Sequence, residues 1–191
     1  MPGKYEAIVI GVSSGGMEAM KFLFSALPRE FSIPIIVVQH MSPHSDSQWI
    51  SVVKKNFPLE FKEADEKEKI LPGHIYIAPP NYHLLVEADR SFSLSVEPKV
   101  NYARPAIDVL FQTASMVYKE KLIGIVLTGS NHDGAEGLKQ IKVCGGLCIV
   151  QDPATAASSY MPQAALEAAQ PQYVLSLKKV IDLLKSIDGL I

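Results

Sequence analysis

The architecture of this chain is indicated first by ten residues near its start, Ala7-Ile-Val-Ile-Gly-Val-Ser-Ser-Gly-Gly16. The first five are mostly apolar and rich in β-branched side chains, which is typical of a buried strand. The glycines that close the stretch predict a tight turn, and residues 17–27 have the spacing of a helix. A strand, a glycine turn and a helix in this order are the first unit of an α/β domain.

Similar units follow along the chain. Apolar runs predict strands at 34–39, 122–127, 147–150 and 173–175. Helices are expected at about 47–56, 107–118, 135–144, 162–169 and 177–187. Because the apolar runs are continuous rather than alternating, the strands are expected to be buried on both faces, as in parallel sheets.

The middle of the chain has a different pattern. Residues 60–69 are charged and expected to be exposed, while 73–78, 83–87 and 92–96 resemble strands in antiparallel pairs with one wet face. No internal repeat or low-complexity linker interrupts the sequence. We therefore predict one domain, residues 1–191, with an α/β fold. Its sheet is expected to be doubly wound and mostly parallel, with helices on both faces and an inserted antiparallel β-hairpin.

Composition argues against several classes of protein. The net charge is −2, from 18 basic and 20 acidic residues, which is not the basic excess typical of nucleic-acid binding. No apolar run is long enough to span a bilayer, and the N-terminus lacks the apolar region of a secretion signal. The expected location is therefore the cytoplasm, without membrane insertion. Cys144 and Cys148 lie in an apolar run without further ligands nearby, so no metal site is expected.

Ligands of open parallel sheets bind beyond the carboxyl ends of the strands. At those ends the sequence offers the hydroxyls of Ser13 and Ser14, the imidazole of His40, and the carboxylates of Asp133 and Asp152. A hydroxyl, an imidazole and a carboxylate in one crevice can act as nucleophile, base and orienting acid in acyl transfer. Either carboxylate fits this topology, and either serine can instead cap the helix that follows.

The turn after the first strand admits two interpretations. The helix that begins near Gly15 aims free backbone N–H groups at this spot, where they can stabilise a developing oxyanion. The same donors can bind a phosphate, which would make the chain a nucleotide-binding α/β domain. The glycine spacing fits neither common phosphate-binding motif, and His40 stands where an acid would hold a ribose.

Taken together, these loops resemble the catalytic domain of the CheB-type receptor methylesterases of bacterial chemotaxis. The likeness runs from about residue 7 to residue 184. It rests on six stretches in order: Ile10-Gly-Val-Ser-Ser-Gly-Gly16 with Glu18-Ala19, Val38-Gln-His-Met41, Leu71-Pro-Gly-His-Ile-Tyr-Ile-Ala-Pro79, Arg104-Pro105 with Asp108-Val-Leu-Phe111, Leu127-Thr-Gly129 with Asp133-Gly-Ala135, and Met161-Pro162.

The resemblance implies Ser13 as nucleophile, His40 as base, and Asp133 rather than Asp152 as the orienting carboxylate. It implies hydrolysis of glutamate γ-methyl esters on receptor helices, with deamidation of certain glutamines as a second activity. No metal or organic cofactor is implied. The implied partners are the helices of methylated chemoreceptors or receptor-like proteins.

Other residues receive supporting expectations. Ser14, Gly15 and Ser130 are expected to support the loops that form the oxyanion site. The candidates for substrate contact are Arg104, Met161 and His83. Two further histidines, His44 and His132, are expected to lie in loops at the periphery.

The sequence departs from the family pattern in two ways. The family usually has Gly-Met-Gly-Asn before the aspartate, whereas this chain has Gly129-Ser-Asn-His132. The family's methionine, thought to help form the oxyanion site through its backbone, corresponds to Ser130, which keeps a backbone donor. Many members also carry an N-terminal receiver domain, for which this chain has no room. The chain is therefore expected to be either a stand-alone esterase, which the initial Met1 favours, or a piece of a longer protein. The altered loop alone supports one more alternative, a catalytically silent scaffold that binds receptor helices.

Overall fold

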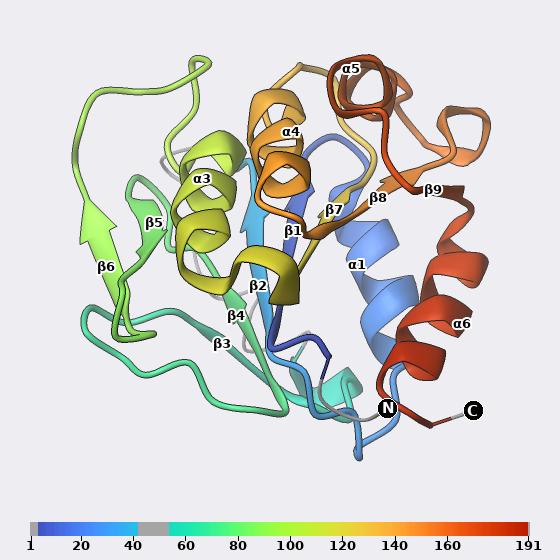
Figure 1. Cartoon of the computed structure of the whole chain (residues 1–191), viewed down its shortest axis with the longest axis horizontal. Helices are drawn as coiled ribbons and strands as arrows, with labels where there is room; N and C mark the ends of the chain where they lie inside the picture. The colour runs from blue at the N-terminus through green and yellow to red at the C-terminus, as the bar shows by residue number, and fades with distance from the viewer. Residues whose placement is uncertain (1–3, 42–53, 191) are drawn as a thin grey trace.

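The computed structural model describes residues 4–41 and 54–190. Within that part of the chain, seven strands form one parallel sheet in the order β3-β4-β2-β1-β7-β8-β9 (Figure 1). The first strand lies centrally, and the chain builds one side of the sheet before the other, so the sheet is doubly wound. The strands are β1 (Ala7–Val12), β2 (Ile35–Gln39), β3 (Glu60–Glu63), β4 (His74–Ile77), β7 (Leu122–Val126), β8 (Leu147–Gln151) and β9 (Tyr173–Leu175).

Helices cover both faces of the sheet (Figure 1). One face carries α1 (Gly16–Ser25) and α6 (Leu177–Ile187), and the other carries α3 (Ile107–Tyr118), α4 (Ala135–Val143) and α5 (Tyr160–Ala169). Three short 3₁₀ helices join these elements: η1 (Lys54–Asn56), η2 (Lys119–Lys121) and η3 (Pro153–Thr155). The α/β fold class expected from the sequence is confirmed.

The strand β1 shows why a continuous apolar run was the right signal. Its side chains alternate between faces, as in any strand. Ile8 and Ile10 pack into the core beneath α1 and α6, whereas Ala7 and Val9 pack into the core beneath α3 and α4. All of these residues are fully buried. A strand covered on both faces has no place for a polar residue, so the run has no alternation.

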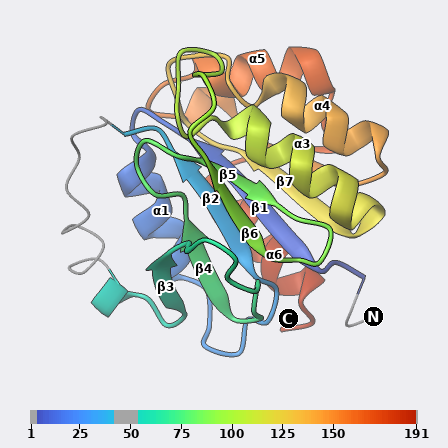
Figure 2. The same cartoon turned by 90° about the vertical axis from the view of Figure 1, so that its left-hand side faces the viewer.

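The inserted hairpin is formed by β5 (His83–Val86) and β6 (Phe92–Ser95), which pair antiparallel. It lies on the same side of the sheet as α3, as the turned view shows (Figure 2). Leu84, Val86 and Phe92 bury their side chains in the core beneath α3. The hydroxyl of Thr113, on α3, accepts a hydrogen bond from the backbone N–H of Val86 at 3.2 Å.

The structure corrects two expectations for the middle of the chain. The charged segment 60–69 contains the edge strand β3, of which Phe61 is the buried anchor. The strand β4, expected in an antiparallel pair, instead lies parallel between β3 and β2 in the main sheet. Of the helix expected at 47–56, residues 47–53 lie outside the described part, and 54–56 form η1. His44 also lies outside it.

The order of the sheet brings three loops to one edge. β1 pairs with β2 on one side and with β7 on the other, so the carboxyl ends of all three are neighbours. The backbone N–H of Ser13 donates to the carbonyl of Thr128 at 2.9 Å, and that of His40 donates to the carbonyl of Val12 at 3.1 Å. These bonds extend the sheet beyond the strands and fix where the loops begin.

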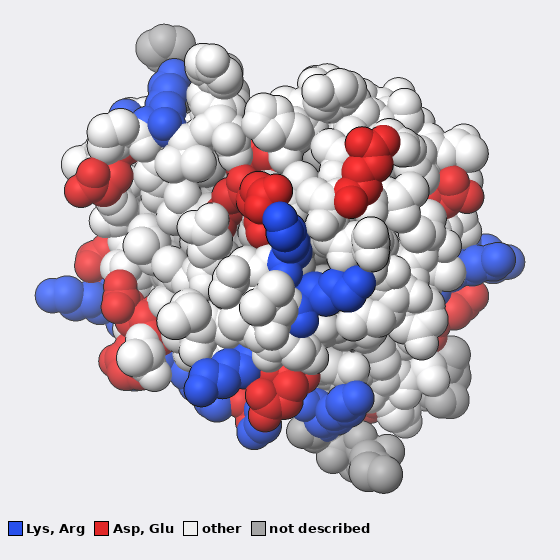
Figure 3. Space-filling model, turned by 45° about the horizontal axis from the view of Figure 1, so that its top comes forward, with Lys and Arg blue, Asp and Glu red and all other residues white. Residues whose placement is uncertain are grey.

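Three further findings concern the surface and the thiols. Of the helices in residues 4–41 and 54–190, none is long and apolar enough to cross a membrane. The face in Figure 3 shows basic and acidic side chains interspersed among uncharged ones, without a continuous basic patch. Cys148 is buried in β8, and burial raises the pKa of its thiol to about 12. No group of three or more acidic, histidine or cysteine residues within the described ranges is placed to hold a metal ion.

Candidate active site

Two side chains from distant parts of the sequence meet at the carboxyl edge of the sheet. His40 follows β2, Asp133 precedes α4, and His40 Nε2 lies 2.7 Å from Asp133 Oδ2. The Asp133 side chain is fully buried, and only 12% of the His40 side chain is exposed. Asp152, the other carboxylate that the sequence offered as a partner for His40, has a different contact. It caps η3 by accepting the backbone N–H of Ala154 at 3.0 Å.

The Asp133 carboxylate is held by three more donors. Its oxygens accept the backbone N–H groups of Ile107 at 2.6 Å and Asp108 at 3.1 Å, and the side-chain amide of Asn101 at 2.9 Å. The two backbone groups are free donors of the first turn of α3, where the helix dipole also favours a negative charge. Burial raises the pKa of Asp133, but the bonds from His40, Asn101 and the backbone outweigh it and hold the pKa below its ordinary value. Asp133 is therefore ionised at neutral pH.

Asp108 mirrors this arrangement. It lies in the first turn of α3, yet its Oδ1 accepts the N–H groups of Gly134 at 3.0 Å and Gly137 at 2.7 Å, at the start of α4. The two helices thus exchange caps, because Asp133 caps α3 and Asp108 caps α4. Asn101 Nδ2 bridges the carboxylates, 2.7 Å from Asp108 Oδ2 and 2.9 Å from Asp133 Oδ1. Burial, together with the charge of Asp133, raises the pKa of Asp108.

The remaining nitrogen of His40 contacts Asn131. The side-chain Oδ1 of Asn131 accepts the backbone N–H of Asp133 at 3.1 Å, which leaves its amide group to face His40 Nδ1 at 3.2 Å. Since an amide NH₂ only donates, Nδ1 must be the unprotonated nitrogen in this arrangement. The proton of the neutral ring is then on Nε2, directed at Asp133, and Nδ1 is the basic atom.

The turn that carries Ser13 is shaped by glycine. Gly15 has φ of 78°, which favours glycine, and a Cβ on Gly16 would lie 2.1 Å from Gln39 Oε1. Gln39 is nearly buried, and its amide donates to the carbonyls of Ser13 at 3.0 Å and His40 at 2.8 Å. One side chain thereby ties the serine loop to the histidine loop.

Ser13, His40 and Asn131 line a single pocket of about 230 Å³. Its opposite wall comes from the loop before α3, including Lys99 and Tyr102, and the Tyr102 side chain is 93% exposed at the rim. No hydrogen bond joins the hydroxyl of Ser13 to His40, both of them described residues, in this conformation. Candidate catalytic pairs are often looser without substrate than in the reacting complex.

The residues expected to support the oxyanion site lie around this pocket. The hydroxyls of Ser14 and Ser130 are 2.8 Å apart and close the gap between the β1 and β7 loops at the surface. Gly15 is the N-cap of α1, and no side chain caps that helix. Neither serine at its start is therefore a cap, and both hydroxyls remain at the candidate site.

The three substrate-contact candidates fare differently. Arg104 borders the pocket, but its guanidinium donates to the carbonyls of Val96 and Glu97 and to Asn81 Oδ1, which anchors the loop before α3. Two expectations are corrected, because Met161 and His83 are each only 1% exposed. The Met161 side chain packs against Gly129. The ring of His83 contacts the carbonyl of Pro98 and the N–H of Ala106. His132 is exposed in the loop before Asp133.

Sequence reasoning missed three residues of the site: Asn101, Gln39 and Asn131. Gln39 lies inside one of the stretches that carry the family resemblance, and Asn131 lies in the loop that departs from the family pattern. Either position could have identified the residue as a candidate for the site. Asn101 carries no such signal, because its role follows from a left-handed backbone, φ 51°, that brings its amide between two carboxylates.

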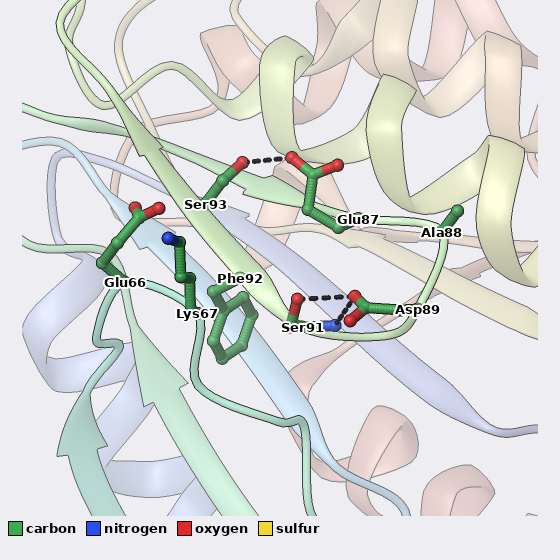
Figure 4. Close-up of a pocket in the computed structure, with 8 residues that line it drawn as sticks. All are labelled: Glu66, Lys67, Glu87, Ala88, Asp89, Ser91, Phe92 and Ser93. Carbon is green, nitrogen blue, oxygen red and sulfur yellow. Dashed lines mark hydrogen bonds between the residues drawn. The ribbon is translucent and has the colours of Figure 1, made fainter.

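A different hollow, of about 550 Å³, lies by the hairpin and is larger than the pocket above (Figure 4). Four of its polar side chains bond in pairs, Asp89 with Ser91 and Glu87 with Ser93. It contains no histidine, and its lining comes from the hairpin and from residues 66 and 67 rather than from the carboxyl ends of the sheet. The smaller pocket is the one lined by a hydroxyl and an imidazole, with the ionised carboxylate of Asp133 buried behind the imidazole.

Comparison with known proteins agrees with this geometry. Residues 8–184 match the family described as CheB methylesterase. The chain belongs to the CheB methylesterase family. The crystal structure of the Thermotoga maritima CheB methylesterase catalytic domain superposes with a TM-score of 0.91 at 34% identity, covering 96% of this chain and 98% of that one. Membership of this family decides against the nucleotide-binding alternative.

The relatives of this CheB-family chain differ in length. A protein-glutamate methylesterase/protein-glutamine glutaminase from Thermotoga maritima is 36% identical over 91% of this chain but only 51% of its own length. A protein from Leptospira interrogans serogroup Icterohaemorrhagiae serovar copenhageni, which carries a provisional form of the same name, is 55% identical over 96% of this chain and 95% of its own. The chain thus spans nearly all of one relative and about half of the other.

Proposed function

We propose that this chain is a serine hydrolase that removes methyl esters from glutamate side chains. Ser13 is the nucleophile, His40 the base and Asp133 the orienting carboxylate. The observation that carries the proposal is the 2.7 Å contact between an ionised, buried Asp133 and His40, a residue that lines one pocket together with Ser13. Family membership supplies the reaction class, since the named relatives are protein-glutamate methylesterases.

The chemistry follows from the tautomer of His40. Nδ1 takes the proton of Ser13 as the serine oxygen bonds to the ester carbonyl carbon, and Asp133 stabilises the imidazolium that forms. The carbonyl electrons move onto the oxygen and return when the methoxy group leaves, which takes the proton from Nδ1 and departs as methanol. Water, deprotonated by Nδ1, then attacks the acyl-enzyme and releases the glutamate carboxylate and Ser13.

Two parts of the surrounding loops fit supporting roles. We assign the backbone N–H groups near Gly15 and Ser130 to the oxyanion of the tetrahedral intermediate. The pair of hydroxyls on Ser14 and Ser130 keeps these loops together at the surface, next in sequence to the pocket residues Ser13 and Asn131. A glutamine side chain has the same carbonyl geometry as the ester, so the same steps, with ammonia as the leaving group, constitute a glutaminase activity.

The proposal extends to partner and location. The substrate is a methylated helix of a chemoreceptor or receptor-like protein, and Arg104 shapes its binding site by holding the loop before α3. The reaction takes place in the cytoplasm. The whole chain, residues 1–191, acts as one catalytic domain.

The test is methanol release from a methylated receptor cytoplasmic fragment. Wild-type protein is expected to release methanol, and Ser13→Ala is expected to lose activity on the order of 10⁴-fold or more. Ser14→Ala is the matched control, because its hydroxyl is one residue away and pairs with Ser130. Equal losses in both variants would contradict Ser13 as the nucleophile, and a folded wild-type protein without turnover would contradict the esterase itself.

A further inference from the structure

The loop after β7 differs from the family's usual sequence at Ser130, Asn131 and His132. The side chains of these three residues make different contacts. Ser130 pairs with Ser14 at the surface, His132 is exposed, and Asn131 alone contacts the base, with its amide 3.2 Å from His40 Nδ1. Where the family pattern has a glycine, this chain therefore adds a hydrogen-bond donor inside the candidate pocket.

The direction of the Asn131 amide is set by the backbone. Because Oδ1 accepts the N–H of Asp133 at 3.1 Å, the NH₂ group must face the pocket. Its partner there is His40 Nδ1, the atom that accepts the proton of Ser13 in the proposed reaction. The bond from Asn131 to His40 consequently exists only while Nδ1 is unprotonated.

Proton transfer reverses that condition. Once Nδ1 carries the proton of Ser13, both atoms are donors and the contact between them is lost. The carbonyl oxygen of the substrate becomes negative in the same step and in the same pocket. Ser13 must take the place of the amide on the single lone pair of Nδ1 before its proton moves, so the N–H group is free when the negative charge forms beside it. Interactions present in the transition state and absent in the ground state are those that accelerate a reaction.

We propose that the side-chain amide of Asn131 is an oxyanion donor in this chain, displaced from His40 Nδ1 by Ser13 and kept off it by the proton that Ser13 transfers. The proposal rests on the proposed esterase function and adds to it a catalytic residue that the family pattern lacks. The oxyanion forms as Ser13 adds to the carbonyl carbon, accepts the N–H of Asn131, and loses that bond when the carbonyl reforms and methanol leaves. The amide itself gains and loses no proton.

Other side chains of the loop fit this role less well. The hydroxyls of Ser14 and Ser130 satisfy each other at 2.8 Å, and neither contacts His40. The amide of Asn101 already donates to two carboxylates. Asn131 is the side-chain donor whose present partner is lost by the chemistry itself.

The experiment compares kcat and KM for methanol release by wild type, Asn131→Ala, Asn131→Asp and His132→Ala. Loss of one oxyanion donor lowers kcat on the order of 10²-fold or more and leaves KM within about threefold. Asn131→Asp keeps an oxygen for the N–H of Asp133 but has no donor, so its kcat is expected to fall as well. His132→Ala changes the neighbouring exposed residue of the same loop and is expected to match wild type.

A second readout does not depend on the natural substrate. A fluorophosphonate labels an activated serine by displacement of fluoride through a five-coordinate transition state whose phosphoryl oxygen is negatively charged, so the labelling rate of Ser13 is expected to fall in both Asn131 variants. Wild-type turnover that is absent in Ser13→Ala establishes the esterase independently of Asn131. Against that background, Asn131→Ala with unchanged or higher kcat would overturn the proposal, as would an equal loss in His132→Ala.

Discussion

Asp133 and Asp89 are both aspartates with lowered pKa values, but they lie in opposite surroundings. Asp133 is fully buried and accepts four hydrogen bonds, two of them from the first turn of α3. Asp89 lies in the hairpin turn, where the hydrogen bonds from Lys69 and Ser91 lower its pKa to about 2, although its side chain is 62% exposed. A lowered pKa alone therefore does not show how much an aspartate contributes to the stability of the fold.

The difference lies in what replaces each interaction when it is lost. Water can solvate Asp89 and Lys69 if their 2.6 Å contact breaks, so the ion pair contributes little to folding. No water is available to Asp133, and every donor around it would lose its acceptor inside the protein. A buried charge with a complete set of donors can therefore hold a histidine ring in place, whereas an exposed one cannot.

The largest expected effect comes from Asp133→Asn. Each carboxylate oxygen accepts two bonds, but an amide has one oxygen, so two donors lose their partner. We expect kcat to fall on the order of 10⁴-fold, because the tautomer of His40 is no longer fixed. The free energy of unfolding should fall by about 1–3 kcal/mol. Methanol release and urea unfolding measure the two effects.

Asp152→Asn is the matched control for that variant. Asp152 lies in a loop at the same edge of the sheet, but it bonds Ala154 rather than His40. Its replacement is expected to leave kcat nearly unchanged. A reversed ranking of the two variants would move the orienting role to Asp152.

A smaller effect is expected from Asn101→Gly, which tests how much the amide between Asp108 and Asp133 contributes to stability. Glycine tolerates the φ of 51° at this position, so the change removes little more than the bridging amide. Asp108 and Asp133 then face each other without their shared donor, and the free energy of unfolding should fall by about 1–3 kcal/mol at neutral pH. Urea unfolding at several pH values measures this difference.

The sign of the pH dependence follows from Asp108. Burial and the charge of Asp133 raise its pKa, so its ionised form opposes folding above that pKa, and the penalty is relieved as the pH falls through it. Removing the amide should increase that penalty. The stability gap between wild type and Asn101→Gly is therefore expected to narrow on acidification. A gap that widens towards low pH would mean that the two carboxylates do not repel each other in the variant.

The smallest effect is expected from Asp89→Asn. The lowered pKa of Asp89 means that its contribution is present above its ordinary pKa and is lost as the pH falls towards about 2. Because the pair with Lys69 is exposed and screened by salt, we expect no resolvable change in Tm or kcat at neutral pH and physiological ionic strength. Calorimetry on the variant measures Tm. A loss of stability as large as that of Asp133→Asn would contradict the difference drawn between buried and exposed aspartates.

The periodicity of apolar residues predicted the helices that each bury one apolar stripe. The helices at 107–118 and 177–187 were predicted with the observed bounds, because each presents one apolar stripe to the core. The strand β3 was missed, because an edge strand buries few side chains and its sequence, Glu-Phe-Lys-Glu, reads as solvated. The place of β4 in the parallel sheet was also missed, since pairing between strands distant in sequence leaves no mark on the strand itself.

The site divides in the same way. The sequence and its family resemblance pointed to Ser13, His40 and Asp133. In the structure Ser13 and His40 line one pocket, and Asp133 is buried against His40. The contacts around them were not predictable from spacing. Asp108 lies in the first turn of α3, but its Oδ1 accepts N–H groups at the start of α4. Asn101 acts through a left-handed backbone conformation that the sequence does not indicate.

The exchange of caps between α3 and α4 also has a consequence for how the chain becomes active. Asp133 binds groups that lie 25, 26, 32 and 93 residues away, so its environment is complete only after loops of very different length have closed. Closing such loops is the slow, entropically costly part of folding. A partly folded chain therefore has no carboxylate held against its histidine, and the ring is not aligned. Recovery of esterase activity during refolding should coincide with the last kinetic phase, in which the two helices dock.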